Sequence, residues 1–377
     1  MSTIQSGSKI MSDFKNYKQS GVDYSVLDQV KSDAINFAKS TVGALSAFGA
    51  SEYGASRGAS AYVMNMQGLN LAIVTEGLGT KSVIAEQYLQ QTGQSRFHDI
   101  AVDAVAAIVN DVISVGALPA LVTAYFSTGD ASWYEDPRRS LELLKGWRHA
   151  CELSQATWGG GESPALPGLV AKDGLELGGS SIGVIPEGID PIFGDAIQPG
   201  QQIILLKSSG LHTNGASLAR LVAKKLPKGL LTTLPSGRDF GSALLDPSII
   251  YVKFVKEVLA AGIRPSFLNA VTGHGLMKVM RGKSQVKFVI EDLPEVPEVL
   301  ETMVDVLQLS KQEAYSTLNM GIGYILTVDE DCVAQVLHLA DLHGYGAIHA
   351  GYVAEGKRGV VVPKFNIEYL GEDLKFS

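Results

Sequence analysis

The seven residues TEGLGTK, Thr75–Lys81, lie between a strand-like apolar run and a segment with a helical pattern. Its two glycines allow backbone conformations and close approaches that a side chain would forbid. The glutamate could then face a metal ion, while the threonine hydroxyl and the lysine ammonium could contact phosphate oxygens. The spacing differs from the G-x-x-x-x-G-K-[ST] phosphate loop, so a purely structural turn remains an alternative.

The composition is that of an ordinary globular protein, with 377 residues, 46% of them hydrophobic and 19% charged. A chain of this length exceeds the size at which one core usually splits, so two domains are expected. The formal net charge is -8 without a Lys/Arg cluster, which argues against a nucleic-acid partner. No apolar run reaches about 18 residues and no signal-type segment is seen, so no membrane partner is expected. Two distant cysteines, Cys151 and Cys332, favour a reduced, cytoplasmic protein.

Strand-like and helical segments are mixed without a regular βαβ rhythm, which favours two α+β domains over a doubly wound sheet. The stretch PEGIDPIFGDAIQPGQQ, 186–202, is rich in Pro and Gly and is predicted to link them. Residues 1–55 are polar and rich in small side chains, so we expect a flexible N-terminal segment. The N-terminal domain is then assigned to 56–187, the C-terminal domain to 198–365 and a tail to 366–377.

Hydrophobic patterns place several elements. AYVMNM and LNLAIVTEG predict a hairpin around Gly68. The run from His98 to Val115 has apolar residues at spacings of three and four, which predicts a helix, and another is expected at 137–154. A glycine-rich loop is expected at Gly159–Gly161. In the second half, IILLKSS, MGIGYILTV and AIHAGYVAEG predict strands.

Carboxylates interrupt the apolar helix. Asp103 and Asn110 are seven residues apart and project together, with Asp111 close by. Buried carboxylates are costly unless they are paired or metal-bound, although a polar outer face is an alternative. Oxygen ligands of this kind suit Mg²⁺, which takes one or two carboxylates with waters and phosphate. A further carboxylate in GGGESPALPG could join them or be a solvated loop residue. The candidate metal ligands are Glu76, Asp103, Asp111 and Glu162, too many for one ion.

Two glycine-containing junctions open helical segments. SSGLHTNG at 208–215 ends a predicted strand, and VTGHG at 271–275 is a similar turn-to-helix junction. Small residues at a helix start suit an anion, and His212 could reach a substrate. The alternative is a capping loop with a solvated histidine. For His274, a turn residue is favoured over a catalytic one. The candidate cofactor-binding residues are Gly77, Gly79, Thr80, Lys81, Asn110, Gly160, Gly161, Ser209, Gly210, Asn214, Thr272 and Gly273.

Taken in order, these motifs resemble the aminoimidazole ribonucleotide synthetase family, the phosphoribosylformylglycinamidine cyclo-ligases of purine synthesis. The matching pieces span nearly the whole chain: YKQSGVD (17–23), TEGLGTK, AVDAVAAIVNDVISVGALP, GGGESPALPG, SSGLHTNGASLAR, DPSIIYVK, VTGHG and LNMGIGYIL. The resemblance implies a two-domain α+β PurM-like architecture whose N-terminal strands form a barrel at a homodimer interface. It implies ATP with Mg²⁺ and a phosphorylated ribonucleotide as ligands. Carried over by motif, the catalytic candidates are His212, Lys81 and Lys31.

The resemblance implies that the γ-phosphoryl group of ATP moves to the formyl oxygen of formylglycinamidine ribonucleotide. The internal amidine nitrogen then closes the ring, with His212 polarising or deprotonating the acceptor. Three positions depart from the family pattern: Glu76 replaces Asp in T-D-G-V-G-T-K, Ala165 replaces a second carboxylate, and Ala270 stands where a histidine is expected, with His274 four residues later. Two alternatives remain open, a superfamily relative that phosphorylates another small acceptor and a nucleotide-binding regulatory dimer without turnover.

Overall fold

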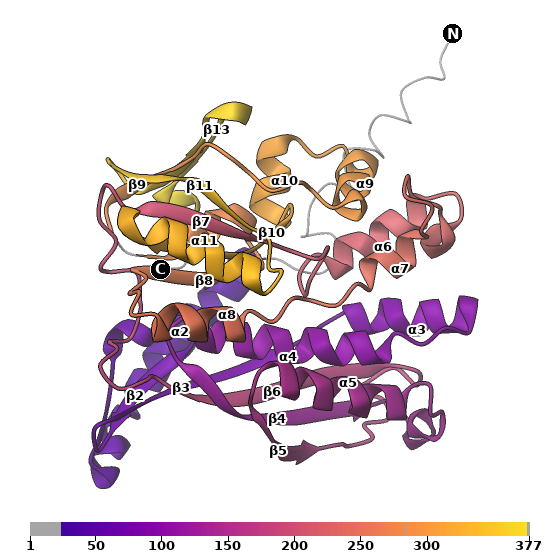
Figure 1. Ribbon diagram of the computed structural model, residues 1–377. Coiled ribbons are helices and arrows are strands. Elements are labelled where there is room, and N and C mark those ends of the chain that lie inside the picture. Colours follow the sequence, from indigo (N-terminus) through magenta and orange to yellow (C-terminus); the bar gives the residue numbers. More distant parts are fainter. Residues whose placement is uncertain (1–23, 283, 375–377) are drawn as a thin grey trace.

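The computed structural model describes residues 24–282 and 284–374. These residues form two stacked mixed α+β domains, each built on one sheet (Figure 1). The helices of the N-terminal domain are α2 (Tyr24–Lys39), α3 (Lys81–Thr92), α4 (Phe97–Ile113) and α5 (Ser140–Leu153). Its strands are β1 (Ala50–Glu52), β2 (Tyr62–Met66), β3 (Leu69–Gly77), β4 (Leu118–Thr128), β5 (Thr157–Glu162) and β6 (Leu175–Val184).

The C-terminal domain holds a seven-stranded sheet of order β13-β12-β9-β11-β7-β10-β8. Its strands are β7 (Gln202–Lys207), β8 (Phe267–Ala270), β9 (Val286–Ile290), β10 (Ile322–Val328), β11 (Ala347–Glu355), β12 (Gly359–Val362) and β13 (Ile367–Leu370). Its helices are α6 (Ala216–Lys225), α7 (Phe240–Leu244), α8 (Val252–Ala260), α9 (Glu298–Leu307), α10 (Lys311–Thr317) and α11 (Val333–Leu342), with a 3₁₀ helix, η6 (Gly275–Arg281).

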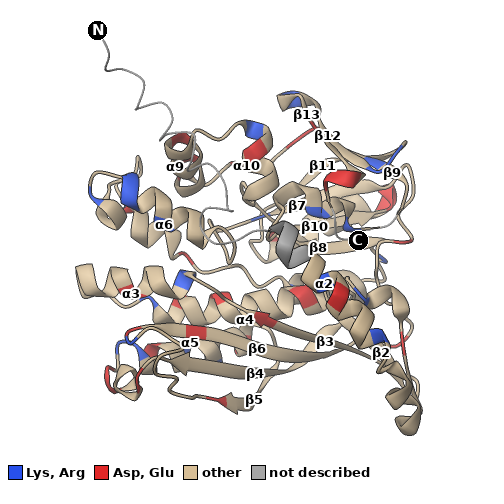
Figure 2. Ribbon diagram, turned by 180° about the vertical axis from the view of Figure 1, so that it is seen from behind, with Lys and Arg blue, Asp and Glu red and all other residues tan. Residues whose placement is uncertain are grey.

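The N-terminal sheet has the order β1-β2-β3-β6-β4-β5, and α3, α4 and α5 lie over one of its faces (Figure 1). A Cβ at Gly179 of β6 would meet Ile108 of α4 and Trp147 of α5, so this residue points toward the helices. Successive strand residues face opposite sides, so Ile182 points away, and so does Tyr125 on β4, which pairs with Gly178 of β6. They are 38% and 40% exposed. The strands β3, β4 and β6 that form the middle of this sheet carry few charged residues (Figure 2).

Helix α4 is the centre of the molecule and confirms the helix expected from His98 to Val115. It packs on β3, β4 and β6, against α5 at its side, and against β8 and α8 of the other domain. The contact with α5 is close because a Cβ at Gly146 would lie 2.2 Å from the carbonyl oxygen of His98. The side of α4 that faces away from the sheet therefore lies against the C-terminal domain.

The predicted hairpin is confirmed as β2 and β3. Gln67 and Gly68 form its two-residue turn with φ of 52° and 89°. Positive φ at both central positions is the type I′ geometry that matches the twist of paired strands. The hairpin sends β3 toward the domain boundary, where Glu76 and Gly77 end the strand.

Three sequence assignments need correction or extension. The glycine-rich loop expected at Gly159–Gly161 is instead part of β5, which runs parallel to β4. A Cβ at Gly161 would lie 2.1 Å from the carbonyl oxygen of Ala124, so glycine permits this close strand approach. The predicted tail, 366–377, contains β13, which pairs with β12. The described part of the expected flexible segment, 1–55, contains α2 and β1; its YKQSGVD motif lies outside the described residues.

Strands β8, β9 and β12 were also not predicted. No helix within 24–282 and 284–374 combines the length and apolar character needed to cross a bilayer.

Candidate functional site

A cavity of about 280 Å³ lies where the two domains meet. The N-terminal domain supplies the end of β3 and the middle of α4, and the C-terminal domain supplies the loop after β7 and the turn that opens η6. Helix α2 adds one lysine. The lining residues are Lys31, Glu76, Gly77, Leu78, Ala107, Asp111, Thr213, Asn214, Thr272, Gly273, His274, Lys278, Arg281 and Leu374.

Two predicted metal ligands, Glu76 and Asp111, share this cavity. Asp111 is only 9% exposed, and its Oδ1 has no hydrogen-bond partner among the described residues. Burial raises the pKa of the Asp111 carboxyl, while Lys278 and Arg281 oppose that rise. Glu76 is open to solvent on one side, yet its enclosure by the cavity, with repulsion from Asp111, raises the pKa of its carboxyl to about 7. The cavity thus holds two under-compensated acidic groups.

Two cations that were not predicted face these carboxylates. Lys278 and Arg281 lie on η6 three residues apart, a spacing that places side chains on one line of a 3₁₀ helix. Burial and the neighbouring Arg281 lower the pKa of the Lys278 ammonium to about 8. Arg281 also reaches across the boundary, donating to Ser60 Oγ at 3.0 Å. Both cations are visible in the sequence as LMKVMR, directly after VTGHG. Only the tertiary structure shows that they lie opposite Glu76.

His274 stands at the bend between β8 and η6. Its φ of 71° confirms that it is a turn residue, and it also lines the cavity. Burial, with the positive charge of Lys278, lowers the pKa of its imidazole to about 4, so the ring is neutral at pH 7. The next residue is held tightly, since a Cβ at Gly275 would lie 2.2 Å from the carbonyl oxygen of Tyr315. The bend therefore fixes the direction of η6.

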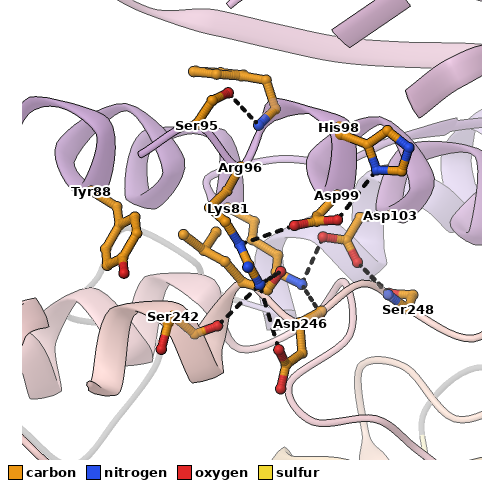
Figure 3. A network of polar contacts seen from close by, with 12 residues as sticks. Lys81, Tyr88, Ser95, Arg96, His98, Asp99, Asp103, Ser242, Asp246 and Ser248 are labelled. Carbon is orange, nitrogen blue, oxygen red and sulfur yellow. Dashed lines mark hydrogen bonds and ion pairs between the residues drawn. The ribbon is translucent and has the colours of Figure 1, made fainter. Parts of the chain in front are cut away.

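Lys81 and Asp103 form a buried ion pair away from the cavity lining (Figure 3). Their charged atoms are 2.7 Å apart and both side chains are fully buried. Lys81 Nζ also donates to the carbonyl oxygen of Asp246 at 3.2 Å. Asp103 Oδ1 accepts from the backbone N–H of Ser248 at 2.9 Å and from its hydroxyl at 2.5 Å. In this arrangement neither charge is available to a ligand, because each is paired within the protein.

Further hydrogen bonds hold a segment of the C-terminal domain, Leu245–Tyr251, against α4. Asn110 Nδ2 donates to the carbonyl oxygen of Ile249 at 2.9 Å, and Asn110 Oδ1 accepts from the N–H of Tyr251 at 3.0 Å. Arg96 donates to the carbonyl oxygen of Leu245 at 3.2 Å. The polar residues that α4 carries at 103 and 110 thus join the domains, whereas Asp111 faces the cavity.

His212 holds the loop that follows β7. Its φ is 57°, it is 6% exposed, and its Nε2 accepts from the N–H of Ser209 at 3.1 Å and of Ile249 at 3.5 Å. Burial, with the nearby charge of Lys81, lowers the pKa of this imidazole to about 3. A nitrogen that already accepts backbone hydrogen bonds is poorly placed to take a proton from a substrate. The geometry favours a positioning role.

Replacing His212 with asparagine, which tolerates positive φ, is expected to reduce the acid sensitivity of folding. Neutral His212 stabilises the fold fully above the unfolded-state pKa of 6.5, and this contribution is lost as the pH falls toward 3. One proton taken up on unfolding corresponds to about 1.4 kcal/mol per pH unit. The free energy of unfolding can be measured with urea at several pH values between about 6 and 4. Its decrease per pH unit should be smaller by that amount in the variant than in the wild-type protein. Equal slopes would contradict the assignment.

The remaining predicted ligands lie elsewhere. Glu162 is exposed on the edge strand β5, together with Gly160 and Gly161, and none of them lines the cavity. Thr80 Oγ1 contacts Ser217 Oγ of α6 at 3.1 Å. Of the candidate cofactor-binding residues, the cavity is lined by Gly77, Asn214, Thr272 and Gly273 but not by Gly79, Thr80, Lys81, Asn110, Ser209 or Gly210.

The four predicted metal ligands therefore do not converge. In the described parts of the chain, no three His, Cys, Asp or Glu side chains gather closely enough to hold an ion by themselves. Mg²⁺ needs only one or two carboxylates when phosphate and water complete its shell. Glu76 and Asp111 meet that requirement, and the unpartnered Asp111 Oδ1 is the kind of oxygen that such an ion would satisfy. The fit extends to these two residues and not to Asp103 or Glu162.

Comparison with known proteins identifies the family. The family model described as "AIR synthase related protein, N-terminal domain" matches residues 58–185, and the corresponding C-terminal domain model matches 198–364. The phosphoribosylformylglycinamidine cyclo-ligase of Lachnospira eligens is 33% identical over 76% of this chain and 82% of the relative. That of Fusobacterium nucleatum is 30% identical over 90% and 97%.

A solved structure shares the fold. The hydrogenase maturation protein HypE in complex with ATP has a TM-score of 0.59 and 19% identity, covering 80% of this chain and 84% of HypE. The family expected from the motifs is confirmed, and with it the mixed two-domain PurM-like fold. The chain belongs to the AIR synthase related family, among the enzymes related to the phosphoribosylformylglycinamidine cyclo-ligases.

Proposed function

We propose that the protein catalyses the ATP-dependent closure of formylglycinamidine ribonucleotide to aminoimidazole ribonucleotide, releasing ADP and phosphate, in purine synthesis. The observation that carries this proposal is the interdomain cavity. Carboxylates from β3 and α4 face a lysine and an arginine from η6 there, as a phosphate-handling site requires. The chain matches relatives named phosphoribosylformylglycinamidine cyclo-ligase over most of their length.

In this proposal the nucleotide phosphates enter between the two domains. Glu76 and Asp111 are the residues that would hold Mg²⁺, which when bound would neutralise phosphate charge. Gly77, Asn214 and Gly273 line the same space, where a phosphate could approach the backbone at the two glycines and accept a hydrogen bond from the Asn214 amide. The ATP-bound HypE structure, which has the same fold, supports a nucleotide in this family of folds.

The chemistry asks mainly for positioning and charge neutralisation. The γ-phosphoryl group moves from ATP to the formyl oxygen of the substrate, which makes that oxygen part of a good leaving group. The amidine nitrogen then attacks the same carbon, and the carbon–oxygen bond breaks to release phosphate. Lys31, which lines the cavity from α2, is placed to attract the anionic ligands. His212 contributes by holding the 208–215 loop, in place of the expected role of polarising or deprotonating the acceptor.

Measured release of ADP tests the proposal. Purified protein should release ADP from MgATP only when formylglycinamidine ribonucleotide is present, with aminoimidazole ribonucleotide formed in equal amount. Release that requires a different acceptor would replace the proposal with phosphoryl transfer by a superfamily relative. Nucleotide binding without release under either condition would indicate a regulatory protein.

We further propose a homodimer through the open face of the N-terminal sheet. Tyr125 and Ile182 are large apolar residues on that face, and large exposed apolar patches commonly mark interfaces. A second copy packed on the same face would bury them and produce the barrel implied by the resemblance. Light scattering that returns the mass of a single chain would contradict this. The cytoplasmic location expected from the cysteines stays a prediction.

A further inference from the structure

The charges in the cavity are divided by domain. Glu76 and Asp111 come from β3 and α4, and Lys278 and Arg281 come from η6 on the other side of the boundary. Lys31 and the neutral His274 complete the titratable lining. Among the described residues, no direct ion pair joins either η6 cation to either carboxylate. The opposite charges therefore face each other across space that a ligand can enter.

The charges nevertheless act on one another across this space. Lys278 and Arg281 each act on the carboxyl groups of both Glu76 and Asp111. Because the groups are partly enclosed, such charges are screened less than they would be at a free surface. Without ligand, the two η6 cations supply positive charge that only partly compensates the two carboxylates.

A divalent ion that enters this cavity alone would be repelled by the positive charges of Lys278 and Arg281. It would gain Glu76 and Asp111 but would lie near an ammonium and a guanidinium held in place by η6. A polyphosphate changes the balance, because its oxygens can pair with Lys278 and Arg281 while others reach the metal. By linkage, each ligand then strengthens the binding of the other.

We propose that Lys278 and Arg281 are built-in counter-cations of Glu76 and Asp111, so that the site binds a divalent metal well only together with a polyphosphate that occupies these two cations. The nucleotide part of this inference rests on the proposed function. The role of the cations toward the metal rests on the cavity alone. Neither residue is needed as a catalytic group for this role; both determine when the metal site is available.

Binding of Mn²⁺, followed by loss of the free-ion electron paramagnetic resonance signal, tests the inference on the full-length protein. Mn²⁺ is used because it shares the oxygen ligands of Mg²⁺. The wild-type protein should bind Mn²⁺ weakly alone and much more tightly with the non-hydrolysable analogue AMPPCP. Lys278→Gln and Arg281→Gln should each bind Mn²⁺ alone about tenfold or more tightly than wild type, because one facing charge is removed.

Two matched controls define the cause. Lys278→Arg keeps the charge and should leave Mn²⁺ binding weak. Lys253→Gln removes an exposed lysine of α8 that does not line the cavity and should change nothing. Thermal unfolding of every variant identifies any that fails to fold, and having two charge-removing variants keeps the test decisive.

The inference is overturned if Lys278→Gln and Arg281→Gln bind Mn²⁺ alone no better than wild type, or if AMPPCP does not tighten Mn²⁺ binding by the wild-type protein. Its failure is separable from failure of the proposed function. A protein that closes no ring but shows the predicted Mn²⁺ pattern would refute the reaction and support the counter-cations. An active enzyme whose Mn²⁺ binding is unchanged by Lys278→Gln and Arg281→Gln would support the reaction and refute the counter-cations.

Discussion

Replacing Asp103 with alanine is expected to lower the free energy of unfolding by about 3–5 kcal/mol. The change leaves the Lys81 ammonium fully buried without its partner, and it leaves the Ser248 N–H and hydroxyl without the oxygen that they share. Removing one partner of a buried ion pair costs far more than removing an exposed one, because the remaining charge cannot be hydrated. Chemical denaturation monitored by circular dichroism measures the loss.

A neighbouring carboxylate on the same helix provides the control. Asp99 pairs with Arg96 near the surface, where both side chains are partly exposed, so Asp99→Ala should cost at most about 1 kcal/mol. Adding Lys81→Met to Asp103→Ala should recover part of the loss, since no unpaired charge then remains buried. If Asp103→Ala costs no more than Asp99→Ala, the pair does not hold the domains together as described.

The Asp103 result bears on how much of the site could be predicted from the sequence. The periodic apolar pattern of α4 predicted the helix, and the cost of burying carboxylates predicted that its acidic residues need partners. The pattern could not say whether a partner is a metal or another side chain. Lys81 lies 22 positions earlier and Ser248 lies in the other domain, so only the tertiary structure shows that Asp103 is satisfied internally while Asp111 is not.

Other elements were missed for similar reasons. β5 has three glycines in a row, which favour a loop by local rules, but the strand forms because β4 accepts a backbone without side chains at close range. Lys278 and Arg281 do not belong to a repeating α-helical pattern, since η6 is a short 3₁₀ helix. Its orientation depends on the bend at His274. Short irregular elements fixed by tertiary contacts are those that periodicity does not reveal.

Asp111→Asn is expected to lower the rate of ring closure by about 100-fold or more while leaving the protein folded. The exchange keeps the shape of the side chain and removes the charge that, with Glu76, faces the phosphates. Losing one preorganised group that acts on transition-state charge typically costs about 10²–10³ in rate. Steady-state assay of aminoimidazole ribonucleotide formation measures the effect, and Asp99→Asn, on the same helix but outside the cavity, should retain the wild-type rate.

Stability separates this role from a structural one. Burial raises the pKa of the Asp111 carboxyl, so its ionised form opposes folding at neutral pH, and Oδ1 has no partner among the described residues to offset that cost. The amide should therefore melt at the same temperature as wild type or higher, the pattern in which a functional group is kept at the expense of stability. Asp111→Asn should also lose the AMPPCP-dependent binding of Mn²⁺. A variant that melts early, or one that is stable and fully active, would remove Asp111 from the site.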